Sequence, residues 1–407
     1  MTSDSPRTIQ LSRRQLLSTS ALFVTLAAHP PTAVAAPTRN TLVCICLRGG
    51  LDGLSALVPY GDSRYYDLRP SVAIPEPGKP FGCIPIDGRF GLHPSLDGLM
   101  PLYQSGELAL VHAAGSPHVT RSHFEAQDYL ETGVPGNAAM DGWLNRYLAM
   151  TPEREHPLRA VAISPSLPRA LHGPAPVLTM VNPSVLRVHT SQGSAEAAFQ
   201  QLYANRRDGL SKSAQSTLRT IDEVRQRAGG PYTPANGARY PASEKRNLMQ
   251  VARLLKAGFE VEVAWLDLGG WDSHVGQRGS GSALAKTLKK LADTLVAFST
   301  DMGEAMRNIV VVVMTEFGRT VAENGTGGTD HGHGGVIFVL GGPVRGGKVH
   351  GEWPGLAKKD LFFGRDLEVT TDYRRVLSDV AQDYLGLNDL EKVFPDYRHR
   401  RLGLFKD

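Results

Sequence analysis

Five short apolar runs lie at wide intervals along the chain, and polar residues hardly interrupt them. They occupy residues 41–47, 108–112, 261–266, 309–314 and 336–340. Runs of this length, rich in Val, Ile and Leu, are typical of strands that are buried on both faces of a sheet. The pattern therefore predicts a central sheet that is covered on both sides.

Between the third and fourth runs, apolar side chains recur at every third or fourth position. This spacing places them along one face of a helix. The recurring positions are Leu284, Leu288, Leu291, Leu295, Phe298, Met302 and Met306. A strand, a helix and a strand in this order make a parallel crossover unit. We therefore predict an α/β fold, with a mostly parallel sheet flanked by helices.

The segment at about 134–260 follows a different pattern. Pro and Ser cluster between residues 152 and 183, a polar helix pattern follows at 196–227, and a second helix pattern at 243–257 leads into the third apolar run. Clusters of Pro, Ser and Gly mark loops more often than buried strands. We interpret this segment as a helical insertion or cap on a single domain.

The first 35 residues resemble a twin-arginine export signal. Arg13 and Arg14 precede a modestly apolar stretch at 21–28, and the small residues at 33–35 fit a cleavage site. A basic N-terminus with a chance arginine pair is the alternative. The apolar stretch falls well short of the roughly 18 residues of a membrane span, so no stable anchor is expected after cleavage. The mature chain, 36–407, is predicted to be one periplasmic or secreted domain.

Composition and charge exclude several classes of protein. Of the 407 residues, 41% are hydrophobic and 21% are charged, which fits a globular chain rather than a disordered one. The net charge is +4, and the leader carries three of the 44 basic and one of the 40 acidic residues, which leaves +2. No nucleic-acid partner is expected at this balance. Cys44 and Cys46, two of only three cysteines, are predicted to be buried structural residues.

Polar residues follow the first four apolar runs where each strand would end. The carboxyl ends of parallel strands share one edge of a sheet, so the loops there converge on one crevice. The candidate groups in these loops are Asp52, Arg121, Ser122, His123, Asp272, His274, Glu316, Asp330, His331 and His333. Imidazoles suit zinc, and carboxylates also accept manganese or calcium. We expect a divalent metal, zinc first, with manganese or calcium as alternatives.

Each loop also has a simpler explanation. Asp52 could bond the backbone of its own glycine turn, and Asp272 could cap a helix. Glu316 could form a plain ion pair with Arg319, since a buried carboxylate is costly without a partner or an ion. The glycine-rich segment 328–334 could be a solvated loop.

The segment 120–123 offers a nucleophile beside possible activating groups. Ser122 lies at the start of a predicted helix, where backbone N–H groups stabilise an anion. A bound metal could deprotonate its hydroxyl, and Arg121 could clamp an anionic group. Alternatively, Ser122 caps the helix and Glu125, three residues on, completes a capping box.

These motifs together resemble the bacterial DUF1501 family, in the expected order and over essentially the whole mature chain. The family's fold is grouped with the alkaline phosphatase and sulfatase superfamily. The motifs are R-G-G-L-D-G at 48–53, S-H-F-E-A-Q at 122–127, G-W-D-S-H-x-x-Q at 270–277, T-E-F-G-R-T at 315–320 and G-T-D-H-G at 328–332.

The resemblance implies particular metal ligands. Asp52 resembles the superfamily's metal-binding carboxylate after the first strand. Asp272 and His274 resemble the Asp and His pair of one metal site, although the phosphatase pair is spaced D-x-x-x-H and this pair is spaced D-x-H. His331 resembles the final histidine ligand.

The second metal site that the resemblance implies is incomplete. Glu316 stands where the superfamily has an Asp-His dipeptide after a strand, and Phe317 replaces the histidine. Asp330 or His333 would have to substitute for it.

The resemblance also bears on the nucleophile and the function. Superfamily members place the nucleophile ten residues before the Gly of a T-G pair, and counting back from Gly133 reaches His123, with Ser122 one residue further. The nucleophile is therefore Ser122, His123 or a metal-bound water. We expect an exported metal-dependent hydrolase that acts on a small-molecule or envelope ester of phosphate or sulfate. A non-catalytic metal- or ligand-binding envelope protein on the same fold is the alternative.

Overall fold

The computed structural model describes residues 39–137, 139–151, 158–186, 189–190, 193–194, 209–242 and 248–406. The predicted export signal lies outside these residues, as do the beginnings of the helices predicted at 196 and 243. No described helix is long and apolar enough to cross a membrane.

A nine-stranded sheet forms the centre of the described chain, in the order β13-β5-β12-β11-β1-β10-β6-β7, with β16 also paired to β5. All five apolar runs are strands of this sheet. The strands are β1 (Thr41–Leu47), β5 (Leu108–Gly115), β6 (Ala160–Ile163), β7 (Leu178–Met180), β10 (Val263–Leu268), β11 (Ile309–Thr315), β12 (Gly335–Gly341), β13 (Val349–His350) and β16 (Thr371–Asp372). Every neighbouring pair is parallel except those of β12, which runs antiparallel to both β11 and β5. The predicted mostly parallel sheet is confirmed.

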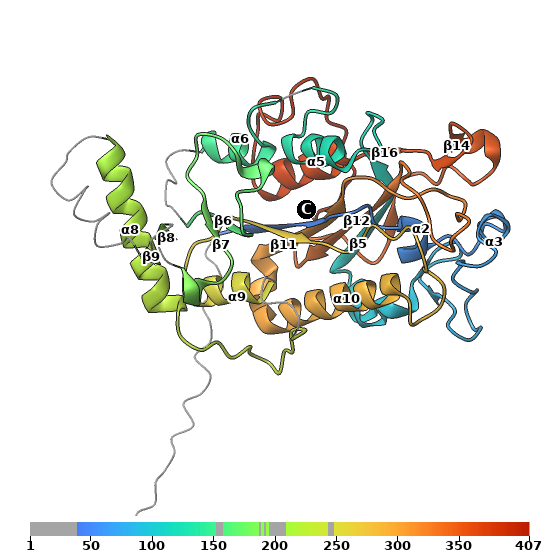
Figure 1. Cartoon of the computed structure of the whole chain (residues 1–407), viewed down its shortest axis with the longest axis horizontal. Coiled ribbons are helices and arrows are strands. Elements are labelled where there is room, and N and C mark those ends of the chain that lie inside the picture. The colour runs from blue at the N-terminus through green and yellow to red at the C-terminus, as the bar shows by residue number, and fades with distance from the viewer. Residues whose placement is uncertain are drawn as a thin grey trace, which may run out of the picture. The chain divides into compact units, whose positions relative to one another are not determined.

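Helices cover both faces of the sheet (Figure 1). One face packs against α9 (Leu248–Lys256), α10 (Ala283–Met302), α4 (Met100–Gln104) and the 3-10 turn η1 (Pro94–Leu99). The other face packs against α6 (Trp143–Ala149) and α11 (Tyr373–Asp379), with α5 (His123–Thr132) on the same side. The predicted helix between the third and fourth strands is α10, which Ser282 caps by accepting a hydrogen bond from Ala285 N at 3.1 Å.

The alternation of side chains along β1 explains why both faces need cover. Val43 and Ile45 point into the core beneath α9 and α10, whereas Cys44 and Cys46 point into the core on the side of α6 and α11. All four are fully buried. Both cysteines are free thiols, which confirms their predicted structural role.

The described part of 134–260 supplies more than a helical cap. It contributes β6 and β7 to the main sheet beyond β10, and α9 to one of the covering layers. It also contains α8 (Gly209–Ala228).

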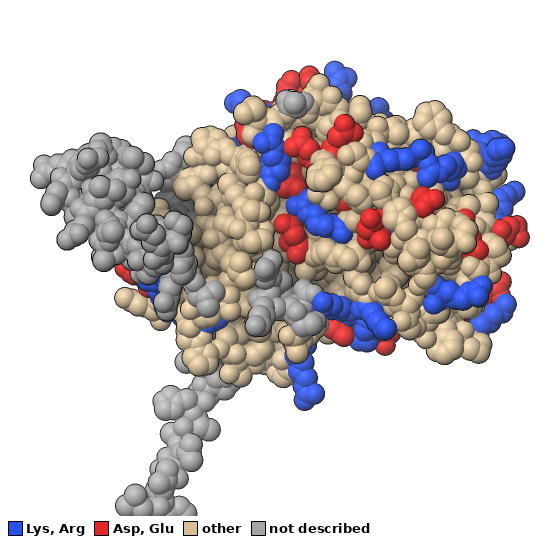
Figure 2. Space-filling model, in the orientation of Figure 1, with Lys and Arg blue, Asp and Glu red and all other residues tan. Residues whose placement is uncertain are grey.

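Smaller elements surround the main layers, and acidic and basic side chains are interspersed over the face in Figure 2. These elements are α2 (Gly53–Ala56), α3 (Arg64–Leu68), β2 (Leu57–Val58), β3 (Ile84–Pro85), β4 (Gly91–Leu92), β8 (His189–Thr190), β9 (Gly193–Ser194), β14 (Leu361–Phe362), β15 (Asp366–Leu367), η3 (Arg169–Leu171), η4 (Pro183–Val185), η5 (Gly303–Asn308), η6 (Lys358–Asp360) and the π-helical turn η7 (Val380–Tyr384).

Candidate metal centre

Three donor atoms converge at the carboxyl edge of the sheet. Asp272 Oδ1 lies 3.0 Å from His274 Nε2 and 3.2 Å from His331 Nε2, and the two Nε2 atoms are 3.0 Å apart. Two tetrahedral ligands, each bound at about 2.1 Å, are separated by about 3.4 Å. The three atoms, which we call the donor triangle, therefore match one face of a metal's coordination shell.

His123 lies beside the donor triangle and is a fourth possible ligand. Its Nε2 is 3.5 Å from Asp272 Oδ2, and ligand atoms of His123, Asp272 and His331 all lie within 4.8 Å of one another. The same Nε2 is buried and has no hydrogen-bond partner among the described residues. A buried ring nitrogen is unfavourable without a partner, so His123 fits the role of a ligand.

The other ring nitrogen of each histidine is bonded to an oxygen. The bonds are His274 Nδ1 to Asp330 Oδ1 (2.9 Å), His331 Nδ1 to the Arg121 carbonyl (2.8 Å) and His123 Nδ1 to Glu316 Oε1 (2.8 Å). The hydrogen bond from His274 lowers the pKa of Asp330, so this carboxyl is an acceptor. Each Nδ1 therefore donates, and each Nε2 presents a lone pair. The facing lone pairs of His274 and His331 repel each other unless both bind a cation, and metal-binding histidines are oriented in this way.

Asp272 is kept ionised by its neighbours. Its side chain is 45% exposed, and Arg319 Nη1 lies 2.9 Å from its Oδ1. Burial works to raise the pKa of Asp272, but the charge of Arg319 outweighs burial, and the pKa lies below its usual value. An ionised carboxylate is the form that binds a metal.

Glu316 contacts the cluster through His123. Its buried carboxylate accepts bonds from Gly49 N (2.8 Å), Gly50 N (3.2 Å), Gln127 Nε2 (2.9 Å), Thr315 Oγ1 (3.0 Å) and His123. Burial works to raise the pKa of Glu316, but the hydrogen bonds from Gln127, His123 and Gly49 lower it overall. The simpler reading of Glu316 as an ion-pair partner of Arg319 is wrong, because Arg319 pairs with Asp272 instead.

The glycine turn after β1 shapes this arrangement. Gly49 and Gly50 have φ values of +124° and +76°, a conformation that favours glycine. A Cβ on Gly49 would lie 2.4 Å from the backbone nitrogen of Asp272. The turn thus brings the loop after β10 against the end of β1 and points two N–H groups at Glu316.

The direction of β12 explains why His331 reaches the site. Because β12 is antiparallel to its neighbours β11 and β5, it begins at the edge where those two strands end, and the segment before β12 joins their loops. Arg319 and His331 form a backbone bridge, and Gly332 N donates to the Gly318 carbonyl at 2.9 Å. The segment 328–334 is therefore packed against the loop after β11, and the alternative of a solvated loop is wrong.

Asp52 and His333 lie in other surroundings. Both oxygens of Asp52 are bonded to the buried Arg69, at 2.8 and 3.0 Å, and Ser55 Oγ donates to the same carboxylate. The His333 ring stacks on Phe362 at 4.4 Å, and burial lowers the pKa of His333 to about 4. Neither residue contacts the donor triangle in the described interactions, so their roles as ligands stay predictions.

The segment before α5 differs from the capping alternative. Ser122 is the N-cap residue of α5, but its side chain makes no capping hydrogen bond. Glu125 instead accepts a bond from Thr120 Oγ1 at 2.6 Å, so the alternative of a capping box is wrong. Arg121 Nη2 lies 3.1 Å from Asp366 Oδ2.

Two contacts of the site were not predicted from the sequence. Gln127 lies one helical turn after His123, and both side chains bond the same oxygen of Glu316. Their spacing of four residues could have indicated this, because such residues share a helix face. The sequence indicates Arg319 only as a partner of Glu316, and no sequence signal places it against Asp272.

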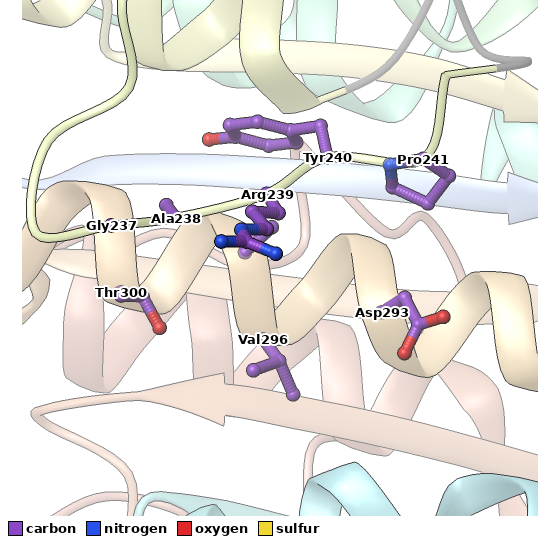
Figure 3. A pocket seen from close by; sticks show the side chains of 9 residues that line it. Gly237, Ala238, Arg239, Tyr240, Pro241, Asp293, Val296 and Thr300 are labelled. Carbon is purple, nitrogen blue, oxygen red and sulfur yellow. The ribbon is translucent and has the colours of Figure 1, made fainter.

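A separate hollow of about 420 Å³ lies between the segment 237–241 and α10 (Figure 3). Arg239 and Tyr240 line it on one side, and Asp293 and Val296 of α10 on the other. None of its lining residues belongs to the donor triangle, and His123 is not among them either.

A family model described as "Protein of unknown function (DUF1501)" matches residues 103–396. The chain belongs to the DUF1501 family. This confirms the resemblance that its motifs indicate. No curated protein matches this DUF1501 chain.

A comparison with solved structures finds several that are similar to the DUF1501 chain. One is a protein of the alkaline phosphatase superfamily from Vibrio parahaemolyticus, with 10% identity and a TM-score of 0.31 over 74% of this chain and 60% of that protein. The C-terminal periplasmic domain of EcEptC from Escherichia coli, in complex with Zn, has 10% identity and a TM-score of 0.31, covering 74% and 72%. A phosphonate monoester hydrolase of Agrobacterium radiobacter has 13% identity and a TM-score of 0.32, covering 89% and 79%. At these identities the likenesses establish no shared activity.

Proposed function

We propose that this DUF1501 protein is an exported metal-dependent hydrolase of phosphate or sulfate esters. The observation that carries the proposal is the donor triangle, in which two imidazole nitrogens and a carboxylate oxygen face one another at 3.0–3.2 Å. The resemblance of the chain's motifs to those of the alkaline phosphatase and sulfatase superfamily suggests the reaction class. A small-molecule or envelope ester is the proposed substrate.

The donor set fits a divalent ion, and zinc best of all. His274, His331 and His123 offer nitrogen and only Asp272 offers oxygen, whereas calcium and manganese prefer sites richer in oxygen. When bound, such an ion supplies Lewis-acid stabilisation of charge on the group that is transferred.

The chain's own residues orient the centre. Asp330 and Glu316 fix the tautomers of His274 and His123, so that the lone pairs point inwards. Ser122 directly precedes His123, and its side chain makes no capping bond to α5. Its hydroxyl is our first choice of nucleophile, with a water molecule as the second.

Metal content and turnover test the proposal together. Protein purified without chelator should contain at least half an equivalent of a divalent metal by elemental analysis. Asp272→Ala should lose most of this metal and any activity on aryl phosphates or sulfates. Asp293→Ala is a matched control, because Asp293 is 42% exposed on α10 and pairs only with Lys289 in the described ion pairs. Full activity in the Asp272 variant would refute the assignment.

A non-catalytic binding protein is the second candidate. The feature that favours it is Phe317, whose ring lies 4.9 Å from the rings of both His123 and His331, where the superfamily has a metal ligand. Tight metal binding with no turnover across a panel of phosphate and sulfate esters would select this candidate.

Export is a separate part of the proposal and rests on the arginine pair of the leader. Replacing Arg13 and Arg14 by lysine should retain the protein in the cytoplasm of a bacterium that has the twin-arginine route. Cell fractionation and blotting measure this. Unchanged export of the double variant would refute the route without affecting the metal chemistry.

A further inference from the structure

Arg319 is a buried cation with unused hydrogen-bonding capacity at the metal centre. Its side chain is 0% exposed, and Nη1 lies 2.9 Å from Asp272 Oδ1. Beyond this ion pair, Nε, Nη1 and Nη2 have no assigned hydrogen-bond partner among the described residues. A buried guanidinium has five N–H donors, and leaving them unpaired is costly.

The two carboxylates that could hold a second ion, Glu316 and Asp52, already accept hydrogen bonds from other residues. Glu316 accepts bonds from the backbone of Gly49 and Gly50 and from two side chains of α5. Asp52 is bonded through both oxygens to Arg69. The sequence motifs implied both carboxylates as metal ligands, yet each is already charge-balanced or fully hydrogen-bonded without an ion.

Arg319 also disfavours a second dication beside the first. Its guanidinium shares Asp272 Oδ1 with the donor triangle, so it lies within a few ångströms of the ion's expected position. A second dication there would meet the charges of both Arg319 and the first ion, with one shared carboxylate between them. Repulsion between such charges is several kcal/mol at about 4 Å near a protein surface.

We propose that the centre holds one divalent ion and that Arg319 supplies the second positive charge. The unpaired N–H groups of Arg319 bind the oxyanion end of the ester, beside the ion held by Asp272, His274 and His331. An oxyanion in this position satisfies the buried donors through charge-assisted hydrogen bonds, which are the strong ones. The inference rests on the proposed function, because it names the residue that recognises the phosphate or sulfate group.

Metal counting and anion binding test the inference without a known substrate. Wild-type protein loaded with zinc is analysed for metal per chain, and titrated with inorganic phosphate and with sulfate in a calorimeter. Arg319→Ala should keep one zinc and bind the anion about 10- to 100-fold more weakly, the loss expected for hydrogen bonds to a charged group. Added guanidinium chloride should restore part of the binding by filling the space that the side chain leaves.

Two further variants separate this role from general effects. Arg278→Ala removes an exposed arginine four residues after His274 and should bind the anion like the wild type. Arg319→Gln keeps more of the side-chain volume, and it replaces Arg319→Ala if circular dichroism shows that the alanine variant does not fold.

Several outcomes would overturn the inference. They are two zinc ions per wild-type chain, no zinc, no anion binding by the zinc-loaded wild type, or undiminished anion binding by a folded Arg319 variant. Failure of the proposed function has a different result. In that case the anion still binds in a way that depends on Arg319, but no ester is hydrolysed, and only the catalysis is rejected.

Discussion

At the scale of single residues, the site depends on hydrogen bonds that lie behind the donor atoms. Asp330 and Glu316 each accept from the Nδ1 of a histidine and so decide which nitrogen faces the centre. Neither carboxylate contributes an atom to the donor triangle. Their contribution should therefore appear as a graded loss of metal affinity rather than as complete loss of the site.

Asp330→Ala tests this contribution. Without its acceptor, His274 can rotate or change tautomer, and the metal affinity should fall about 10- to 100-fold. Competition with a chromophoric chelator measures the affinity. Asp222→Ala is the control, because Asp222 is 51% exposed on α8 and Asp330 is 53% exposed. Equal affinities in wild type and Asp330→Ala would show that the bond to His274 is incidental.

The sequence could predict the convergence of Asp272, His274 and His331, because all three stand near strand ends and carry ligating groups. It could not distinguish a ligand from a nucleophile at His123, since that depends on which way the first turn of α5 faces. The sequence likewise could not place Arg319 beside Asp272. That position depends on the backbone bridge between Arg319, in the loop after β11, and His331.

At the scale of elements, the hydrophobic pattern located the long strands but not all of the sheet. Strands β6 and β7 have only four and three residues and lie in a segment rich in Pro and Ser, so no run of apolar residues marked them. The reversed direction of β12 was also beyond the sequence, because a strand buried on both faces reads the same whether it is parallel or antiparallel. That reversal is what brings His331 to the site.

Gly49→Ala tests how far the turn after β1 positions the centre. The added Cβ would lie 2.4 Å from Asp272 N, and the φ of +124° is strained for alanine. We expect a loss of about 1–3 kcal/mol in the free energy of unfolding from the strain alone, together with weaker metal binding because the Asp272 loop must move. Urea unfolding measures the first effect and chelator competition the second.

Gly325→Ala is the matched control for this change. A Cβ at Gly325 meets no atom within 4 Å, and the residue lies in the loop that leads to Asp330. It should leave both stability and metal affinity within error of wild type. A Gly49 variant that behaved like this control would mean that the two loops are positioned independently of the turn.

At the scale of the whole molecule, two cores on opposite faces of one sheet hold the loops in place. The side of the sheet that faces α9 and α10 also buries His93 and His112. His93 Nδ1 accepts a hydrogen bond from Ser95 N at 3.0 Å, and the His112 ring lies 5.0 Å from that of Phe90. Both environments favour the neutral imidazole, and burial lowers the pKa of each histidine to about 4.

These two histidines predict that the protein loses stability in mild acid. A histidine in the unfolded chain has a pKa of about 6.5. Between about pH 6.5 and pH 4 the unfolded chain therefore binds protons that the folded chain does not, and the free energy of unfolding falls as the pH falls through this window. At pH 5 each histidine should account for a loss of about 2 kcal/mol, at about 1.4 kcal/mol per unit of pKa difference.

His112→Phe separates this effect from acid loss of the metal. The variant keeps an aromatic ring against Phe90 but has no proton to gain, so its loss of stability between pH 7 and pH 5 should be smaller than that of wild type by about 2 kcal/mol. Urea unfolding at both pH values, with chelator present throughout, gives the difference. His118→Phe at an exposed position is the control. An equal loss of stability in His112→Phe and wild type would contradict this prediction. It would mean that His112 gains a proton in the folded protein at no cost, so that its ring is not buried against Phe90.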